Sequence, residues 1–218
     1  MAKYLITGIA GFIGSALARA LVQRGQDVRG VDNFLTGNAA NLAGIEAQID
    51  FRESDLRDAA AMRSACEGVD YILHIGALPS VPLSVEKPGP SHACNVDGTF
   101  HVLEGARAAG VKRVVYAASS SAYGDQPVLP SKESMRPMPI SPYAVQKLTG
   151  EYYMSSYWQV YGLETVSLRY YNVFGPRQGA DSPYSGVLAK FILQMLEGTR
   201  PTIFGKSSKK SPRSNSIG

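Results

Sequence analysis

The stretch Tyr4-Leu5-Ile6-Thr7-Gly8-Ile9-Ala10-Gly11-Phe12-Ile13-Gly14 decides the fold of this 218-residue chain. Its first three residues form a short apolar run of the length of a buried strand. Three glycines follow at a spacing of three, and residues 15–22 then place apolar side chains at helical spacing. A strand, a glycine-rich turn and a helix, in this order, are the context in which such a glycine motif indicates a dinucleotide site.

Each glycine of this motif has a separate task at a dinucleotide site. Gly8 allows a sharp turn, Gly11 lets the backbone approach a pyrophosphate, and Gly14 lets the helix pack tightly. The first turn of the helix offers free N–H groups and the positive end of the helix dipole to the phosphates. A turn that uses glycine for packing alone would account for one or two of the three.

A carboxylate follows the motif at the spacing that ribose binding requires. Residues 27–32 read as a second strand that ends in Asp32, eighteen residues after Gly14. The Asp32 carboxylate would accept hydrogen bonds from the ribose hydroxyls and repel a 2′-phosphate, which favours NAD over NADP. A solvated acid at a strand end is the alternative.

Strands and helices alternate along the rest of the chain. Periodicity predicts further strands at 49–56, 69–77 and 111–118, and helices at 58–66, 91–109 and 143–161. A proline-punctuated loop is expected at 78–84. This alternation predicts an α/β fold, a Rossmann-like doubly wound parallel sheet with helices on both faces.

Composition narrows the class of protein. The net charge of +4 comes from the last thirteen residues, without which 18 basic residues stand against 18 acidic ones. We therefore expect no nucleic-acid partner for the folded body. No apolar run is long enough to span a membrane, and the N-terminus enters the first strand directly, so we expect a cytoplasmic protein without a signal peptide. Cys66 and Cys94 predict neither a disulfide framework nor a metal site.

Two segments carry candidate catalytic side chains. The strand at 111–118 ends in Ser119-Ser120-Ser121, which would place hydroxyls beside a substrate. Ser141 and Pro142 then fit the start of a helix in which Tyr143 and Lys147, four residues apart, share one face. An ammonium beside a phenol lowers the phenol's pKa of about 10, so Tyr143 could take a proton from a sugar hydroxyl while a hydride passes to NAD.

These motifs together resemble those of extended short-chain dehydrogenases/reductases, and among them the nucleotide-sugar 4-epimerases, most of all the branch that acts on UDP-N-acetylglucosamine or UDP-glucose. The matching stretches span nearly all of residues 4–205. They are residues 8–14, 32–37, 77–82, 116–125, 141–147 and 168–178.

The resemblance implies a role for each matching residue. The implied catalytic residues are Tyr143, Lys147 and Ser119, with Ser120 still a candidate for the hydroxyl. The implied NAD-contacting residues are Gly8, Gly11, Phe12, Ile13, Gly14, Asp32, Asn33, Gly37, Asp55, Leu56, Tyr143, Lys147 and Tyr171. The implied substrate-binding residues are Ser84, Ser119, Ser120, Tyr143 and Asn172. The resemblance also implies a UDP-sugar substrate, no metal, and a homodimer formed through the helices at 91–109 and 143–161.

The subclass depends on the residues immediately after the catalytic hydroxyl. Dehydratases of the family carry an Asp-Glu pair there and decarboxylases a nearby Glu, whereas this chain has Ser120, Ser121 and Ala122. The resemblance therefore implies 4-epimerisation with NAD regenerated. A UDP-glucuronate 4-epimerase, or an NAD-binding remnant without catalysis, are the alternatives.

The family pattern stops at Gly205. We expect residues 1–178 to form the NAD-binding domain, 179–205 to begin an incomplete C-terminal substrate domain, and 206–218 to be a disordered basic tail. The abrupt switch at residue 206 suggests a truncated or frameshifted product with impaired activity.

Overall fold

The computed structural model describes residues 1–178 and 187–200. Contacts divide the chain into two units, Met1–Arg177 and Gln178–Gly218. The first unit holds all the predicted site residues. Of the second, the described part contains one helix, α7 (Val187–Leu196). Residues 179–186 and 201–205 of the predicted substrate domain, and the predicted tail at 206–218, lie outside the described residues.

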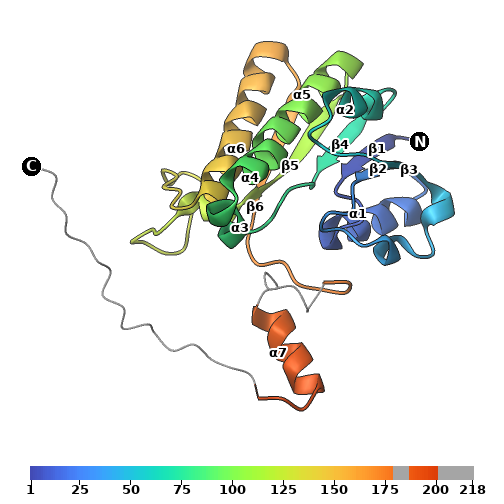
Figure 1. Ribbon diagram of the computed structural model, residues 1–218. Helices are drawn as coiled ribbons and strands as arrows, with labels where there is room; N and C mark the ends of the chain where they lie inside the picture. The colour runs from blue at the N-terminus through green and yellow to red at the C-terminus, as the bar shows by residue number, and fades with distance from the viewer. Residues whose placement is uncertain (179–186, 201–218) are drawn as a thin grey trace, which may run out of the picture. The chain divides into compact units, whose positions relative to one another are not determined.

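The first unit alternates strands and helices as the sequence predicts (Figure 1). Its strands are β1 (Lys3–Thr7), β2 (Asp27–Asp32), β3 (Ile49–Glu53), β4 (Tyr71–His74), β5 (Arg113–Ser119) and β6 (Glu164–Tyr170). Its helices are α1 (Phe12–Gln23), α2 (Ala59–Cys66), α3 (Val81–Glu86), α4 (Pro88–His92), α5 (Gly98–Ala109) and α6 (Pro142–Tyr161).

The strands pair in parallel in the order β3-β2-β1-β4-β5-β6. Chain order reverses between β1 and β4, and in open α/β sheets ligands bind beyond the carboxyl ends of the strands at such a reversal. The predicted doubly wound fold is confirmed, and it directs attention to the residues that follow β1 and β4.

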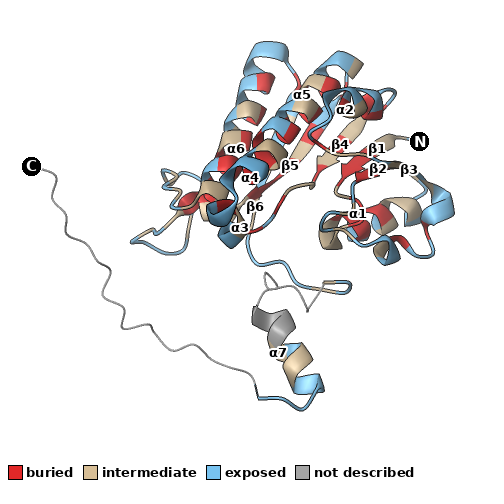
Figure 2. Cartoon of the chain, viewed as in Figure 1, coloured by how far each residue is buried: buried red, intermediate tan, exposed pale blue. Residues whose placement is uncertain are grey.

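Two apolar clusters cover the two faces of the sheet, because successive strand residues point to opposite sides. On one face of the sheet, Leu5, Ile72 and Val114 pack against α2, α5 and α6. On the other face, Ile6 and Val28 pack against α1. Figure 2 shows the buried residues concentrated along the strands and on the helix surfaces that face them.

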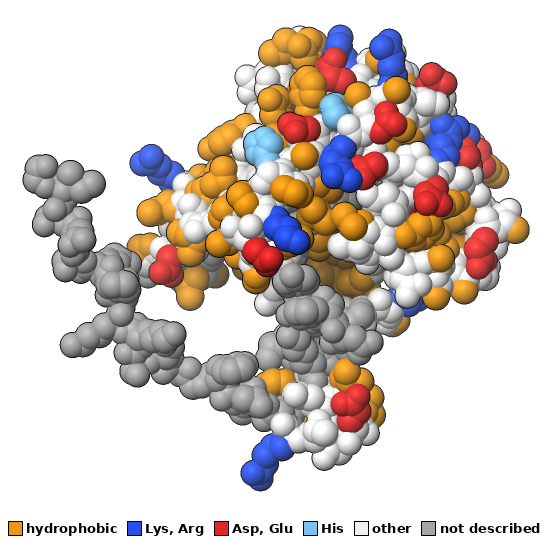
Figure 3. Space-filling view, in the orientation of Figure 1, with side chains coloured by type: hydrophobic (Ala, Val, Ile, Leu, Met, Phe, Trp, Pro, Cys, Tyr) orange, Lys and Arg blue, Asp and Glu red, His pale blue; other side chains and the backbone are white. Residues whose placement is uncertain are grey.

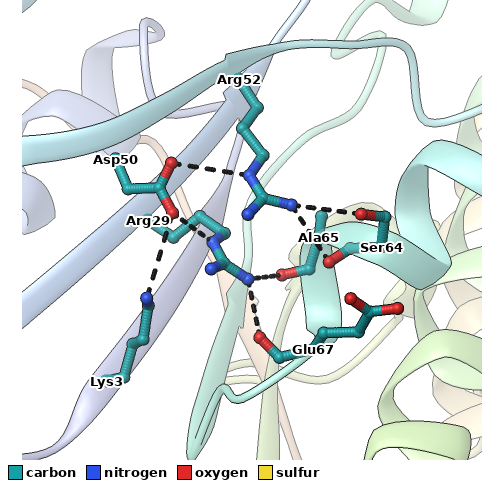
Figure 4. Close-up of polar contacts among 7 residues, drawn as sticks. All are labelled: Lys3, Arg29, Asp50, Arg52, Ser64, Ala65 and Glu67. Atoms are coloured by element: carbon teal, nitrogen blue, oxygen red, sulfur yellow. Dashed lines mark hydrogen bonds and ion pairs between the residues drawn. The ribbon is translucent and has the colours of Figure 1, made fainter.

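A buried arginine ties the sheet to α2 (Figure 4). Arg29 on β2 donates from Nε to Asp50 on β3 at 2.7 Å, and from Nη1 to the carbonyls of Ala65 and Glu67 at 2.8 Å each. These carbonyls belong to the end of α2, where backbone acceptors lack helical partners. The Arg29 guanidinium therefore links β2, β3 and the end of α2.

One local prediction was incomplete and another was wrong. Residues 91–109 are helical as predicted, but a π-helical turn, Ala93–Asp97, separates α4 from α5 within this span. The loop expected at 78–84 contains α3, whose Ser80 side chain accepts from the Leu83 N–H at 3.0 Å. Pro82 lies in the first helical turn, where its missing N–H costs nothing. No helix in the described part of the chain is long and apolar enough to cross a membrane.

Candidate active site

The glycine-rich turn joins β1 to α1 in the geometry that the sequence predicts. Gly8 has φ +70°, and a Cβ there would lie 2.8 Å from the Cα of Gly76, which follows β4. A Cβ on Gly14 would lie 2.1 Å from the Gly8 carbonyl oxygen. The turn therefore excludes side chains at both positions and keeps the backbone at the sheet reversal bare.

Helix α1 begins at this turn without a side-chain cap. Gly11 is its N-cap residue, and a Cβ there would lie 3.1 Å from the Gly8 carbonyl oxygen. Phe12, Ile13 and Gly14 form the first turn, whose N–H groups have no carbonyl partner within the helix. Such a helix start accepts an anion readily, so the residues present fit a dinucleotide pyrophosphate.

The carboxylate at the end of β2 is held in place by the backbone. Asp32, which is 8% exposed, accepts from the Ala10 N–H and the Phe34 N–H, both at 2.9 Å. A Cβ on Gly37 would lie 2.8 Å from Oδ1 of Asp32, so the glycine leaves that oxygen approachable. A carboxyl group fixed at the end of β2 suits two ribose hydroxyls, as the sequence predicts.

Asn33 and Asp55 lie together beyond β2 and β3. The Asn33 amide donates to Asp55 at 2.7 Å, and Arg57 forms two hydrogen bonds with the same carboxylate, at 2.9 and 2.7 Å. These hydrogen bonds, that from Arg57 first, lower the pKa of Asp55. Leu56 is 8% exposed, and its carbonyl accepts from His101 at 3.0 Å. Asn33, Asp55 and Arg57 thus form one polar cluster beyond β2 and β3.

Tyr143 and Lys147 lie in the first turns of α6, which the Ser141 side chain caps by accepting from the Ala144 N–H at 3.2 Å. Ser119 ends β5, and its hydroxyl acts on the Tyr143 phenol in the direction that lowers the pKa of that phenol. Its Oγ also accepts from the Ser121 hydroxyl at 2.8 Å. The structure therefore favours Ser119 over Ser120 as the hydroxyl paired with the phenol.

The pKa of Tyr143 departs from the expectation. Burial raises it above its usual value, and the Ser119 hydroxyl only partly offsets that effect. Burial also lowers the pKa of Lys147 to about 8, since its side chain is almost entirely enclosed. The expectation that the ammonium alone would lower the pKa of Tyr143 is thus wrong for the protein by itself, in which the phenol stays protonated near neutrality.

Ser84 in α3 lies against the start of α6. It is fully buried, its hydroxyl donates to the Val81 carbonyl at 2.7 Å, and it accepts from the Tyr143 backbone N–H at 3.0 Å. The structure exposes no surface of Ser84 to a ligand, and the predicted contact with substrate stays a prediction. Ser84 satisfies the N–H of Tyr143 at the start of α6.

Tyr171 and Asn172 follow β6 and are both exposed. The Tyr171 ring stacks on that of Tyr123 with 6.5 Å between centroids, which orders it beyond the carboxyl end of the sheet. Asn172 lies next to it, and its predicted contact with substrate stays a prediction.

Sequence reasoning missed a network of amide side chains that contacts α6. Asn95, in the π-helical turn, accepts from the Leu78 N–H at 2.7 Å and donates to Gln146 Oε1 at 2.8 Å. Ser91 donates to the same Gln146 oxygen at 2.8 Å. Gln146 sits between Tyr143 and Lys147, so the network joins the catalytic helix to the segment after β4. The position of Gln146 inside the Tyr-x-x-x-Lys motif was the signal.

A second missed network consists of hydroxyls around a buried imidazole. Thr99 donates to the Asn95 carbonyl at 2.7 Å, so its oxygen accepts from His74 Nε2, 3.0 Å away. Nδ1 of His74 then accepts from the Thr7 hydroxyl at 2.7 Å, and Thr7 in turn accepts from the Gly76 N–H at 3.0 Å. This donor order makes His74 a neutral imidazole. Burial lowers its pKa to about 3.

Comparison with known proteins agrees with this geometry. A nucleotide-binding α/β protein with a Tyr-x-x-x-Lys helix is the class that the fold and the site define. Residues 4–212 match the NAD dependent epimerase/dehydratase family. The chain belongs to this family, which confirms the predicted resemblance and the predicted cofactor class.

Similar proteins include a UDP-glucose 4-epimerase from Mycolicibacterium smegmatis, 39% identical over 94% of this chain and 67% of the relative. Among solved structures, a UDP-N-acetylglucosamine 4-epimerase from Methanobrevibacter ruminantium M1, in complex with UDP-N-acetylmuramic acid, has a TM-score of 0.90 at 38% identity, covering 94% of this chain and 66% of that one. A UDP-glucose 4-epimerase from Thermus thermophilus, in complex with NAD, has a TM-score of 0.84 at 38% identity, covering 90% and 63%. The chain therefore spans about two thirds of the length of these relatives.

Proposed function

We propose that this chain carries the NAD-binding and catalytic part of a UDP-sugar 4-epimerase. One observation carries the proposal: Tyr143, Lys147 and Ser119 converge at the carboxyl end of β5, in the same sheet whose reversal bears the bare glycine turn. The relatives described above are named for UDP-glucose and UDP-N-acetylglucosamine, which supports a UDP-sugar as substrate.

The proposed reaction inverts C4 of the sugar. Ser119 holds the C4 oxygen, and Tyr143 takes the hydroxyl proton as the C4–H bond gives up a hydride. The glycine turn and Asp32 would hold NAD, which would supply a hydride acceptor and a positive charge that would lower the pKa of the nearby phenol. The 4-keto sugar then rotates in the site and presents its other face. Tyr143 returns the proton to the oxygen, and the hydride returns to the opposite face of C4. No net oxidation occurs.

The residues after Ser119 support epimerisation rather than elimination or decarboxylation. Ser120, Ser121 and Ala122 carry no carboxyl group, so no second acid or base is supplied from these positions. The 4-keto sugar then has no route forward except reduction.

The first test is an epimerase assay on the full chain with NAD, offering UDP-N-acetylglucosamine, UDP-glucose and UDP-glucuronate separately. Conversion of one of the first two supports the proposal. Tyr143→Phe should lower the rate by about 10²–10⁴-fold, the usual worth of a positioned acid or base. Tyr152→Phe is the matched control, since it makes the same change at an exposed position of the same helix.

Two results would count against the proposal. Turnover that survives Tyr143→Phe would assign the proton transfer to another group. No turnover of any of the three sugars, with NAD still raising the melting temperature, would reduce the function of this chain to cofactor binding.

We further propose that the protein acts as a cytoplasmic homodimer. Large apolar side chains on α5 and α6 are exposed, among them Phe100 (39%), Val145 (49%) and Tyr152 (62%). Figure 3 shows hydrophobic side chains gathered over this part of the molecule. An exposed apolar patch of this kind is typical of a protein–protein interface.

A further inference from the structure

The ammonium of Lys147 lies in an unusual place for a charge. The residue is 3% exposed, and no ion pair joins it to another described residue. A buried, unpaired ammonium normally carries a large desolvation penalty and gives up its proton. The groups that surround Nζ therefore decide how far the charged form is retained.

The ring of Tyr116 is one of these groups. Nζ of Lys147 lies 4.4 Å from the ring centroid, well within the range of a cation–π interaction. Tyr116 is fully buried on β5, and its other neighbour is the neutral His74 ring, stacked at 5.5 Å with 28° between planes. The hydroxyl donates to the Lys147 carbonyl at 3.4 Å. The stacked His74 ring and the hydrogen bond of the hydroxyl therefore fix the position of the Tyr116 ring.

Gly150 makes room for this ring. A Cβ at position 150 would lie 2.4 Å from the Tyr116 hydroxyl oxygen and 2.5 Å from Cζ. Any side chain there would push α6 off the ring, and the turn that carries Lys147 would move with it. Glycine inside a helix costs about 1 kcal/mol relative to alanine, which argues for a packing reason at this position.

We propose that Tyr116 is a positioning residue: the face of its ring is the seat on which the Lys147 ammonium lies, and Gly150 is the residue that admits the ring. This inference rests on the proposed function, since the same lysine serves the proposed reaction. Tyr116 acts through Lys147 and does not touch the substrate.

Among the other groups near the lysine, the Glu151 carboxylate also favours the charged form, because it acts to raise the pKa of Lys147. His74 on β4 is neutral, and the carboxylate of Glu151, the next acid along α6, is paired with Arg169 on β6 at 2.7 Å. The pKa of the Cys94 thiol in the π-helical turn is raised to about 11 by burial, so it carries no charge near neutrality. The titratable and charged groups that face Lys147 are His74, Cys94, Tyr116, Tyr143 and Glu151 with its partner Arg169.

The test measures the pKa of Lys147 directly in the full chain. Lysine is labelled with ¹³C at Cε, the Lys147 signal is identified by its absence from Lys147→Arg, and its chemical shift is followed with pH. Tyr116→Phe keeps the ring face and should leave the pKa unchanged. Replacing position 116 by 3,4,5-trifluorophenylalanine keeps the shape but weakens the negative face, and should lower the pKa by about one unit, a tenfold change in the ionisation constant.

Tyr116→Leu removes the face altogether and should lower the pKa of Lys147 at least as far. Tyr157→Leu is its matched control, because Tyr157 belongs to the same apolar cluster and lies on α6 without facing Lys147. If Tyr116→Leu does not fold, the fluorinated ring, which is nearly isosteric with Phe, still decides the question.

If fluorination of the ring at position 116 leaves the pKa of Lys147 unchanged, the proposed role of Tyr116 is wrong, whatever the epimerase assay shows. An equal shift in Tyr157→Leu would also contradict that role, since it would indicate general loosening of α6. Conversely, absence of epimerisation would refute the proposed reaction and leave the titration result in place, so the two failures are distinguishable.

Discussion

His74 shows how one buried side chain couples the fold to pH. Its ring is 1% exposed and hydrogen-bonded on both nitrogens, to Thr7 and Thr99. Its protonation is unfavourable in the folded state because the imidazolium would be buried without a counterion.

This argument predicts a specific acid sensitivity. The pKa of His74 is lowered from 6.5 to about 3 in the folded protein, so between these values the unfolded chain binds more protons. The contribution is therefore fully present above about pH 6.5 and is lost as the pH falls toward 3. At pH 5 the loss amounts to about 2 kcal/mol of unfolding free energy.

Urea unfolding at pH 7 and pH 5 measures this loss. The unfolding free energy should fall between pH 7 and pH 5 in both proteins, but by about 2 kcal/mol less in His74→Gln. The Gln amide can still donate and accept hydrogen bonds but does not titrate. The carboxylates contribute equally to both chains. An identical pH dependence in the two proteins would show that His74 titrates normally.

At the scale of elements, the first turn of α6 depends on hydrogen bonds to side chains outside the helix. Two serines satisfy its first-turn N–H groups, Ser141 from the cap position and Ser84 from α3. The second bond reaches across 59 residues to the backbone of Tyr143. A serine that looked like a substrate ligand from its sequence position thus supports the catalytic helix.

Ser84→Ala should destabilise the protein by about 1–2 kcal/mol, because it leaves the Tyr143 N–H without a partner in a buried place. The measurement is urea unfolding alongside an epimerase assay. Ser141→Ala, which removes an ordinary cap, should cost about 1 kcal/mol and calibrates the result. Unchanged stability together with a raised KM for the UDP-sugar would support the substrate contact that the sequence suggested.

The sequence predicted those elements whose signals are local. The turn at Gly8–Gly14 and the acid at Asp32 follow from spacing and glycine chemistry, and Tyr143 with Lys147 from helical periodicity. The turn containing Asn95 could not be foreseen, because a π-helical turn differs from an α-helix by one residue and leaves no period of its own. Tyr116 was hidden for a different reason: its role depends on a contact with another element, and the sequence shows it only as one more apolar residue in a strand.

At the scale of the whole molecule, the exposed apolar face on α5 and α6 is typical of a surface that another protein covers. Val145 and Tyr152 are seven residues apart on α6 and so share one face. Phe100 on α5 extends this surface through its contact with Tyr153, 5.7 Å between ring centroids. A second copy of the chain would cover such a surface in the proposed homodimer.

Light scattering after size exclusion should therefore give twice the chain mass of 23.4 kDa. Tyr152→Glu should raise the dissociation constant at least tenfold, since it places a charge inside an apolar interface. Leu35→Glu is the control, because Leu35 is equally exposed, at 61%, but lies in the segment after β2. A monomeric parent chain, or equal effects of the two changes, would exclude this face as the interface.

The chain of hydroxyls around His74 has a consequence for how this protein can change over generations. Thr7 and Gly76 stand at the glycine turn, Thr99 stands on α5, and the His74 ring between them supports Tyr116. Because donors and acceptors in this network are matched one to one, replacing any one member leaves its neighbours without a hydrogen-bond partner. Substitutions here should be strongly epistatic, tolerated together and damaging alone. The cofactor turn and the lysine seat would then be inherited as one unit.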